Sequence, residues 1–216
     1  MKKTFWTTRN IAGCAILGAM SILLYLFVKF KLPFIFPSFL DFQFSEVPAL
    51  IAGYAYGPIG GIIVIILRFI GKIAFMGSQT AYVGEVADLI IGLALVIPSS
   101  IIYKRHRNIK GAVASFVISA LLSTIVALIA NAFVLIPFYL KLYFNNDVEA
   151  LVRALSIIPG ISSSNYLLYY IFYACLPFNL LRYLAVGILT FALYKRIKWL
   201  LDKIGHQKKK ENENNQ

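Results

Sequence analysis

The stretch "DFQFSEVPALIAGYAYGP", residues 41–58, decides how this chain is placed in a membrane. Its first six residues carry four polar side chains, and an apolar run then continues to Gly57-Pro58. A helix over 46–56 spans only about 16 Å at 1.5 Å per residue, roughly half of a hydrocarbon core. The chain ahead of it must therefore enter the bilayer region as irregular backbone, which is tolerated only beside protein or an aqueous cavity. We expect the first external loop to dip inward and line a cavity open to the outside. The alternative is a simple surface loop followed by a helix that begins near Phe39.

The composition indicates a polytopic membrane protein of one domain. Hydrophobic residues make up 60% of the 216 residues and charged residues only 14%, whereas soluble domains have about 25% charged residues. The fold class is predicted to be all-α, with one domain over 1–204 and a disordered polar cytoplasmic tail over 205–216. The expected transmembrane helices lie at about 11–30, 46–56, 58–75, 83–103, 112–139 and 167–194.

The count of six depends on whether residues 47–75 form one tilted helix or two helices joined at Gly57-Pro58. With two helices, both termini and the loop "YKRHRNIKG" share one side, which then holds fourteen of the 21 lysines and arginines. The other side holds six, and Arg182 lies within a helix. Since short cytoplasmic loops are rich in Lys and Arg, we predict six crossings with both termini in the cytoplasm.

Several function classes are excluded by missing motifs. The basic residues lie between and beyond the apolar stretches, so they indicate topology rather than nucleic-acid binding. His106 and His206 lie in basic segments, and no metal spacing, nucleophile elbow or Walker loop is present. We predict that the chain is not an enzyme, binds no metal and has no cofactor. If it transports a solute, the energy comes from a partner or an ion gradient.

Polar residues within apolar segments are the candidate ligand-binding groups, because each is costly in the membrane. They include Asn131, Asn179 and Arg182, together with Glu85 and Asp88 at the start of the helix over 83–103. Arg182 either faces a cavity or forms a structural ion pair with Asp88 or Glu85. The two carboxylates could instead only complement a helix N-terminus.

Two further segments have a predicted role. The stretch "FNNDVEALVRALSIIPG", residues 144–160, is expected to form a short external helix, capped near Asn146 or Asp147, that covers a cavity or lies on the membrane. The first helix carries small residues at spacings of three and four, which allow another helix to approach closely. These residues are Ala12, Ala15 and Ala19. They favour either packing within this protein or docking of a partner subunit.

Four spaced motifs, "FSEVPALIAGYAYGPIGG", "GSQTAYVGEVADLIIG", "NAFVLIPFY" and "PFNLLR", give the chain a resemblance to a known family. It resembles the substrate-binding (S) components of energy-coupling factor (ECF) vitamin transporters, and the riboflavin type most of all. This resemblance implies six helices without catalytic activity, capture of a vitamin from outside, and delivery through a transmembrane coupling subunit and two ATP-hydrolysing subunits.

The resemblance also implies positions for both sites. An alanine-rich face of the first helix docks to the coupling subunit, and Ala12, Ala15 and Ala19 match it. The implied substrate-binding residues are Gln43, Phe44, Ser45, Gly84, Glu85, Asp88, Asn131, Asn179 and Arg182.

The sequence departs from the family pattern in the loop, where Gln43 and Glu46 replace the two aspartates of the usual Asp-Phe-Ser-Asp motif. It also has Asp88 where Asn is common and Arg182 where Lys is expected. An S component for a different vitamin is therefore an alternative. A stand-alone secondary transporter, with Glu85 and Asp88 as ion-coupling carboxylates, is another.

Overall fold

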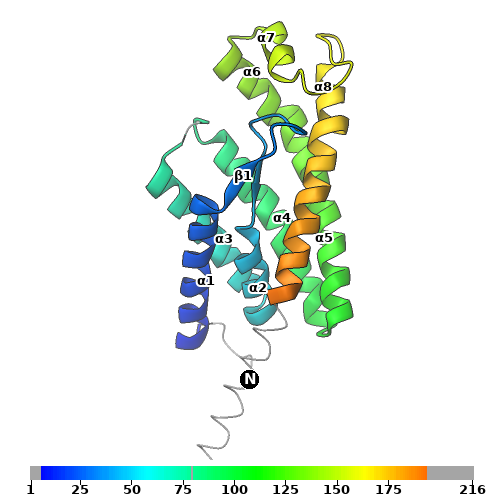
Figure 1. Ribbon diagram of the computed structural model, residues 1–216. Coiled ribbons are helices and arrows are strands. Elements are labelled where there is room, and N and C mark those ends of the chain that lie inside the picture. The colour runs from blue at the N-terminus through cyan, green and yellow to red at the C-terminus, as the bar shows by residue number, and fades with distance from the viewer. Residues whose placement is uncertain (1–5, 79, 194–216) are drawn as a thin grey trace, which may run out of the picture.

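The structure is a computed structural model, and it describes residues 6–78 and 80–193. The predicted tail over 205–216 lies outside the described residues. Figure 1 shows a bundle of roughly parallel helices with short connections at both ends. The helices in chain order are α1 (Thr8–Phe27), α2 (Glu46–Tyr56), α3 (Pro58–Met76), α4 (Val83–Arg105), α5 (Ile109–Ala130), α6 (Ile136–Phe144), α7 (Val148–Ala154) and α8 (Tyr166–Tyr169).

Five helical segments are long and apolar enough to span a membrane: Thr8–Phe27, Pro58–Met76, Val83–Arg105, Ile109–Phe144 and Tyr166–Leu193. The short α2 makes the sixth, and its bounds are those expected from its sequence. Large apolar side chains cover the outside of the bundle, among them Phe27 at 77% exposure. An apolar exterior on long helices is the surface that lipid requires, so the prediction of an all-α membrane protein is confirmed.

The short α2 is enclosed by its neighbours instead of facing lipid. Nine of its eleven residues are buried. Glycines bring the adjoining helices close, because a Cβ on Gly53 would lie 2.1 Å from Ser100 Oγ of α4. A Cβ on Gly61 of α3 would lie 2.3 Å from Val96 Cγ1, also of α4. Small residues at helix crossings permit this close approach, and it holds α2 and α3 against α4 at the centre of the fold.

The loop between α1 and α2 dips into the bundle, as predicted. The hydroxyl of Ser21 donates a hydrogen bond to the carbonyl of Ser45. Ser21 lies six residues before the end of α1, or about 9 Å below it at 1.5 Å per residue. The alternative of a surface loop with a helix beginning near Phe39 is wrong, because α2 begins at Glu46.

The dipping loop contains two strands that we did not predict. β1 (Lys29–Lys31) pairs antiparallel with β2 (Asp41–Gln43), with Phe30 opposite Phe42. The predicted first helix over 11–30 is therefore three residues too long at its C-terminal end, since the chain leaves the helix after Phe27 to form this hairpin. Pairing satisfies backbone groups that would otherwise be costly at membrane depth.

Two of the long helices are interrupted by π-helical turns, which the sequence did not predict. η1 (Asn131–Leu135) joins α5 to α6, and η2 (Tyr170–Cys175) follows α8. The expected helix over 112–139 is therefore longer, from Ile109 to Phe144, with a break in its regular hydrogen bonding. Such π segments are frequently found at functional sites.

The short helix predicted within residues 144–160 is present as α7, and Asp147 caps it by accepting a hydrogen bond from the backbone N–H of Ala150 (3.1 Å). Its Leu151 and Leu155 are buried. In Figure 1, α6 and α7 lie at the end of the bundle away from the N-terminus, above the loop that carries β1.

Candidate substrate pocket

A cavity of about 400 Å³ opens in the half of the bundle that contains the β1–β2 loop. Its walls come from this loop, the ends of α1 and α3, the first turns of α4, the η1 region, α6, and the last long helix. Leu151 of α7 closes part of it. Ligand pockets commonly have volumes of about 300–1,000 Å³, so the cavity is large enough for a small organic ligand.

Seven of the nine predicted substrate-binding residues line this cavity: Gln43, Gly84, Glu85, Asp88, Asn131, Asn179 and Arg182. The other two do not. Ser45 is completely buried beneath the cavity, where its hydroxyl accepts a hydrogen bond from Arg68 Nη1 (2.9 Å). Phe44 packs against the central core and lies 6.2 Å from Phe30, ring centre to ring centre. Both side chains therefore support the loop and do not face the cavity, because consecutive residues entering α2 point in different directions.

A network of buried and half-buried charges lies at the base of the cavity and beneath it. Glu46, at the N-terminus of α2, pairs with Arg182 and lies 3.5 Å from Arg68 Nη1. Arg68 Nη2 donates to Asp88 Oδ2 at 2.9 Å. Gln43 Nε2 donates to the other oxygen of Asp88 at 3.1 Å. The network thus joins the dipping loop, α2, α3, α4 and the last helix around the base of the cavity.

The partner of Arg182 differs from the two carboxylates considered for it from the sequence. Arg182 pairs with Glu46, and neither Asp88 nor Glu85 is its partner. Asp88 pairs with Arg68, and Glu85 pairs with Lys72 at 3.5 Å. The alternative in which Arg182 pairs with Asp88 or Glu85 is therefore wrong, because the dipping loop brings Glu46 to the depth of Arg182, which also lines the cavity.

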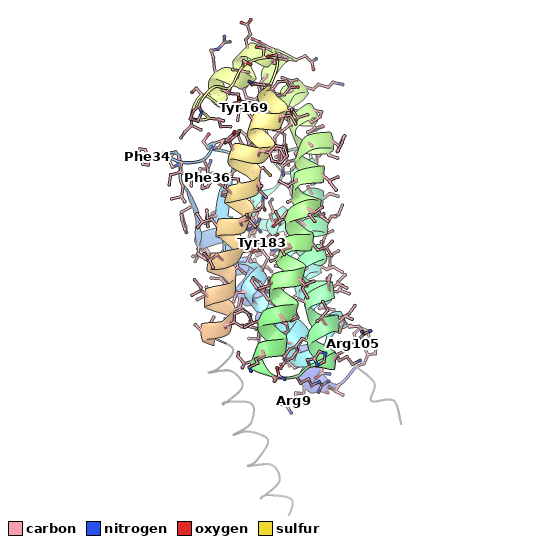
Figure 2. The ribbon with its side chains drawn as sticks, turned by 90° about the vertical axis from the view of Figure 1, so that its right-hand side faces the viewer. Arg9, Phe34, Phe36, Arg105, Tyr169 and Tyr183 are labelled. Atoms are coloured by element: carbon pink, nitrogen blue, oxygen red, sulfur yellow. The ribbon has the colours of Figure 1, made fainter. Side chains whose placement is uncertain are left out.

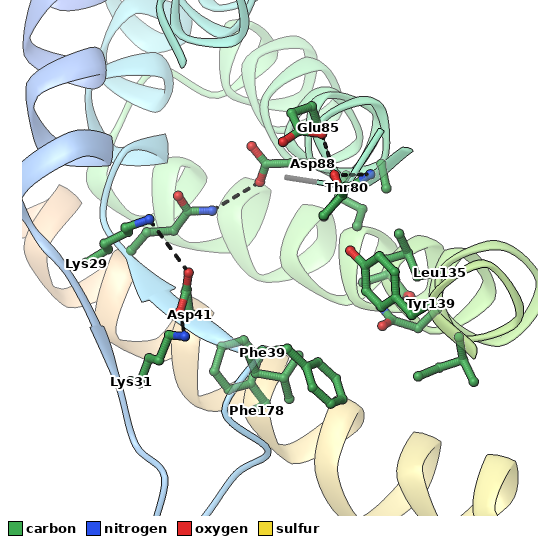
Figure 3. Close-up of a pocket in the computed structure, with 18 of the residues that line it drawn as sticks. Lys29, Lys31, Phe39, Asp41, Thr80, Glu85, Asp88, Leu135, Tyr139 and Phe178 are labelled. Carbon is green, nitrogen blue, oxygen red and sulfur yellow. Dashed lines mark hydrogen bonds and ion pairs between the residues drawn. The ribbon is translucent and has the colours of Figure 1, made fainter. Parts of the chain in front are cut away.

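Glu85 is held at the side of the cavity by the segment ahead of α4. Its Oε2 accepts hydrogen bonds from Ser78 Oγ (2.9 Å) and Thr80 Oγ1 (2.5 Å). The Lys72 ammonium lies 4.8 Å from the centre of the Tyr25 ring. Figure 3 shows Glu85, Asp88 and Thr80 converging on one side of the cavity. These contacts fix the direction of the carboxylate and of the loop before it.

Two lysines and one aspartate form the rim. Lys29 Nζ and Lys31 Nζ lie 3.9 and 4.0 Å from the two carboxylate oxygens of Asp41. All three side chains are partly exposed, and Figure 3 shows them together on the hairpin. Exposed pairs of this kind contribute little to stability, about 0–1 kcal/mol each. The rim is therefore a charged entrance that can rearrange at low cost.

Another part of the wall combines amides with aromatic rings. Asn131 Oδ1, in η1, accepts a hydrogen bond from the hydroxyl of Tyr170 in η2 (2.8 Å). Asn179 Nδ2 donates to the carbonyl of Cys175 (2.8 Å). Phe39, Tyr139 and Phe178 add aromatic surface to the same cavity, and Figure 3 shows their rings along its lower side. Such a wall can stack on a planar ligand and hydrogen-bond its edge.

Comparison with known proteins identifies the family. The chain matches the family "ECF transporter, substrate-specific component" over residues 9–194. The chain is a member of this family. It is 30% identical to a riboflavin transporter, RibU, of Staphylococcus aureus, over 91% of this chain and 94% of that protein. It is 24% identical to the riboflavin transporter FmnP of Bacillus subtilis, over 88% of this chain and 95% of that protein.

A solved structure of the S component of a bacterial ECF transporter has the same fold. It superposes with a TM-score of 0.66 at 28% identity, covering 89% of this chain and 97% of that one. This S component is thus a membrane transport protein, and its relatives are transporters rather than enzymes. Among the residues that the structure describes, no group of three or more His, Cys, Asp or Glu could hold a metal ion.

Sequence reasoning missed several residues that shape the pocket of this S component. Lys29, Lys31 and Asp41 lie in a hairpin that we did not predict, and Lys72 was not among the predicted binding residues. Arg68 is 1% exposed and does not line the cavity, yet it connects two of the carboxylates beneath it. The only indication of its role in the sequence is that a cation lies within an apolar helix, and this does not identify the carboxylates with which it pairs.

Proposed function

We propose that this S component captures riboflavin, or a closely related flavin, from outside the cell in the described pocket. The observation that carries the proposal is the convergence of seven predicted residues, six of them polar, from four separate parts of the chain, on one cavity of about 400 Å³. The cavity offers both hydrogen-bond donors and acceptors beside aromatic rings. A flavin presents a flat ring system with both kinds of group along its edge, and two similar proteins are described as riboflavin transporters.

Arg182 is the best candidate for direct contact with the ligand. It lines the cavity, it is 6% exposed, and its Nε has no hydrogen-bond acceptor among residues 6–78 and 80–193. A buried donor without a partner is costly. A carbonyl oxygen of the bound flavin would satisfy this donor.

The orientation follows from charge. The pocket lies at the end of the bundle opposite the basic loop after α4, and Figure 2 shows Arg9 and Arg105 together at that other end. The positive-inside rule places the basic end in the cytoplasm. The pocket then faces the outside and both termini are cytoplasmic.

A stand-alone ion-coupled transporter is less well supported. Glu85 and Asp88 would have to gain and lose protons or bind a cation. Both carboxylates are already paired with cations of α3, Lys72 and Arg68. Binding a transported cation would therefore require that these ion pairs be broken.

Riboflavin binding to the purified protein tests the proposal. Flavin fluorescence is expected to be quenched with a sharp equivalence point at one flavin per protein. Absence of quenching at micromolar protein would reject the flavin assignment. Binding of another vitamin in the same pocket would then be measured by mass spectrometry of the protein purified from cells.

Delivery to the cytoplasm is proposed to require a coupling subunit, which docks on α1, and two ATP-hydrolysing subunits. Ala12, Ala15 and Ala19 are all exposed on one side of α1, whereas Cys14 and Gly18 are buried on the other. Small exposed residues on a helix let another helix approach closely. This arrangement disfavours packing within the protein as the role of the alanines and supports docking of a partner.

Replacing Ala15 by Trp is therefore expected to separate binding from transport. Uptake of riboflavin in cells that contain the complete transporter should fall by roughly tenfold or more, because a large side chain prevents close helix approach. Equimolar flavin quenching by the purified variant should persist. Ala114→Trp on the exposed face of α5 is the matched control. Equal uptake by the two variants would contradict docking through α1.

A further inference from the structure

A second cavity of about 400 Å³ lies at the basic end of the bundle, opposite the substrate pocket. It lies between the start of α1, the turn from α2 to α3, and the end of α4. Its lining residues are Asn10, Gly53, Tyr54, Ala55, Tyr56, Gly57, Pro58, Ile59, Ser100, Tyr103, Lys104 and Arg107. The proposed capture of substrate involves only the first pocket and does not explain this second cavity.

The cavity owes its space to the turn between α2 and α3. Gly57 has φ of 87° and ψ of −179°, a conformation that side chains disfavour, and a Cβ there would meet nothing within 4 Å. The 19-residue α3 begins at Pro58, and no side chain among the described residues caps it. The positive end of its macrodipole lies at the cavity together with the negative C-terminal ends of α2 and α4, so the side chains decide the charge of the cavity.

The charge of the lining has one sign. Lys104 and Arg107 are both exposed at the edge of the cavity, and neither forms an ion pair within the described part of the chain. None of the twelve lining residues is acidic. The substrate pocket differs, since Asp41, Glu85 and Asp88 line it beside its cations. The second cavity is thus suited to an anion.

The rest of the lining of the second cavity fits an amphipathic molecule, with an anionic group at one end and an apolar part at the other. The hydroxyl-bearing residues Tyr56, Ser100 and Tyr103 line its wall. Ile59, at the edge, is 49% exposed and continues into the apolar outer face of the bundle. Tyrosines commonly lie at the depth of lipid headgroups, and basic pockets between helices on the cytoplasmic side bind anionic headgroups.

We propose that this cavity binds the phosphodiester headgroup of an anionic phospholipid such as phosphatidylglycerol. Lys104 and Arg107 neutralise the phosphate, and the acyl chains lie along Ile59 and the outer face. A free phosphate compound has the same anionic group but no apolar part that would contact Ile59 and the outer face. The bound lipid anchors the α2–α3 turn at the membrane surface, and this role is independent of riboflavin binding.

Native mass spectrometry of the full chain in mixed phosphatidylglycerol and phosphatidylcholine tests the proposal. The wild type should retain phosphatidylglycerol in preference to phosphatidylcholine. Lys104→Ala/Arg107→Ala should reduce the affinity for phosphatidylglycerol by roughly 30-fold, because each basic side chain near the surface contributes a factor of about five. Arg105→Ala/Lys110→Ala, which removes the same charge from exposed positions outside the lining, is the matched control. It should keep the wild-type preference.

Equal loss in the two double variants would overturn the proposal, because it would show a general charge effect. No preference for phosphatidylglycerol in the wild type would overturn it as well. A second experiment measures the melting temperature of lipid-free protein in detergent after inorganic phosphate is added. A rise in melting temperature that only Lys104→Ala/Arg107→Ala abolishes would overturn the lipid as the source of the phosphate. Flavin quenching in every sample separates these outcomes from failure of the substrate assignment.

Discussion

The Arg68→Met variant is expected to lose about 3–5 kcal/mol of stability, the usual effect of removing one partner of a buried ion pair. Arg68 is 1% exposed and lies 2.9 Å from Asp88 and 3.5 Å from Glu46. Met keeps much of the volume but leaves Asp88 without its cation. The measurement is the melting temperature of the purified protein in detergent, which should fall by several degrees.

Two comparisons establish that charge is responsible. Arg153→Met is the matched control, since Arg153 also lies near two carboxylates, Asp147 at 3.5 Å and Glu149 at 3.9 Å, but is 68% exposed. Its effect should be below about 1 kcal/mol. The double variant Arg68→Met/Asp88→Asn should recover part of the lost stability, because the uncompensated charge is then absent. Equal melting temperatures for Arg68→Met and Arg153→Met would show that the buried network is not a stabilising element.

The Arg182→Gln variant is expected to bind riboflavin about 30- to 100-fold more weakly than the wild type. Hydrogen bonds that involve a charged group contribute about 1.5–3 kcal/mol, and each 1.4 kcal/mol corresponds to a factor of ten in affinity. Gln is shorter, carries no charge and cannot replace the guanidinium. Titration of flavin fluorescence gives the dissociation constant, and Arg182→Lys should retain a larger part of the affinity.

The structural role of Arg182 has to be separated from contact with the ligand. Glu46→Gln removes the charge partner of Arg182 but changes a residue that does not line the cavity. It should lower the melting temperature while changing riboflavin affinity less than Arg182→Gln does. If Arg182→Gln lowers only the melting temperature and leaves the affinity unchanged, Arg182 is a structural ion-pair residue and does not contact the flavin.

Much of the membrane architecture followed from local sequence features. Each long apolar run gives a spanning helix because its length and hydrophobicity are sufficient by themselves. The short apolar run over residues 47–56 predicted α2 and, with it, the dipping loop. The cap of α7 at Asp147 was likewise readable from the adjacent residues.

The π-helical turns and the hairpin were not predictable in this way. η1 and η2 meet through the hydrogen bond from Tyr170 to Asn131, residues 39 positions apart. β1 and β2 are three-residue strands without a periodic pattern, so only their pairing defines them. Both features depend on contacts between distant segments, which local propensity does not contain.

The sequence by itself determined which segments cross the membrane, which loops are basic, and which polar residues lie at membrane depth. The tertiary structure alone decided which charges pair: Arg182 with Glu46, and Arg68 with Asp88. The free-energy cost of a charged side chain in the membrane depends on that residue alone, and the apolar residues around it in the chain show that it lies within a membrane span. Pairing depends on how far each helix is rotated and how deep the loop descends. Those quantities are set by packing across the whole bundle, where close contact at Gly53 and Gly61 fixes the positions of α2, α3 and α4.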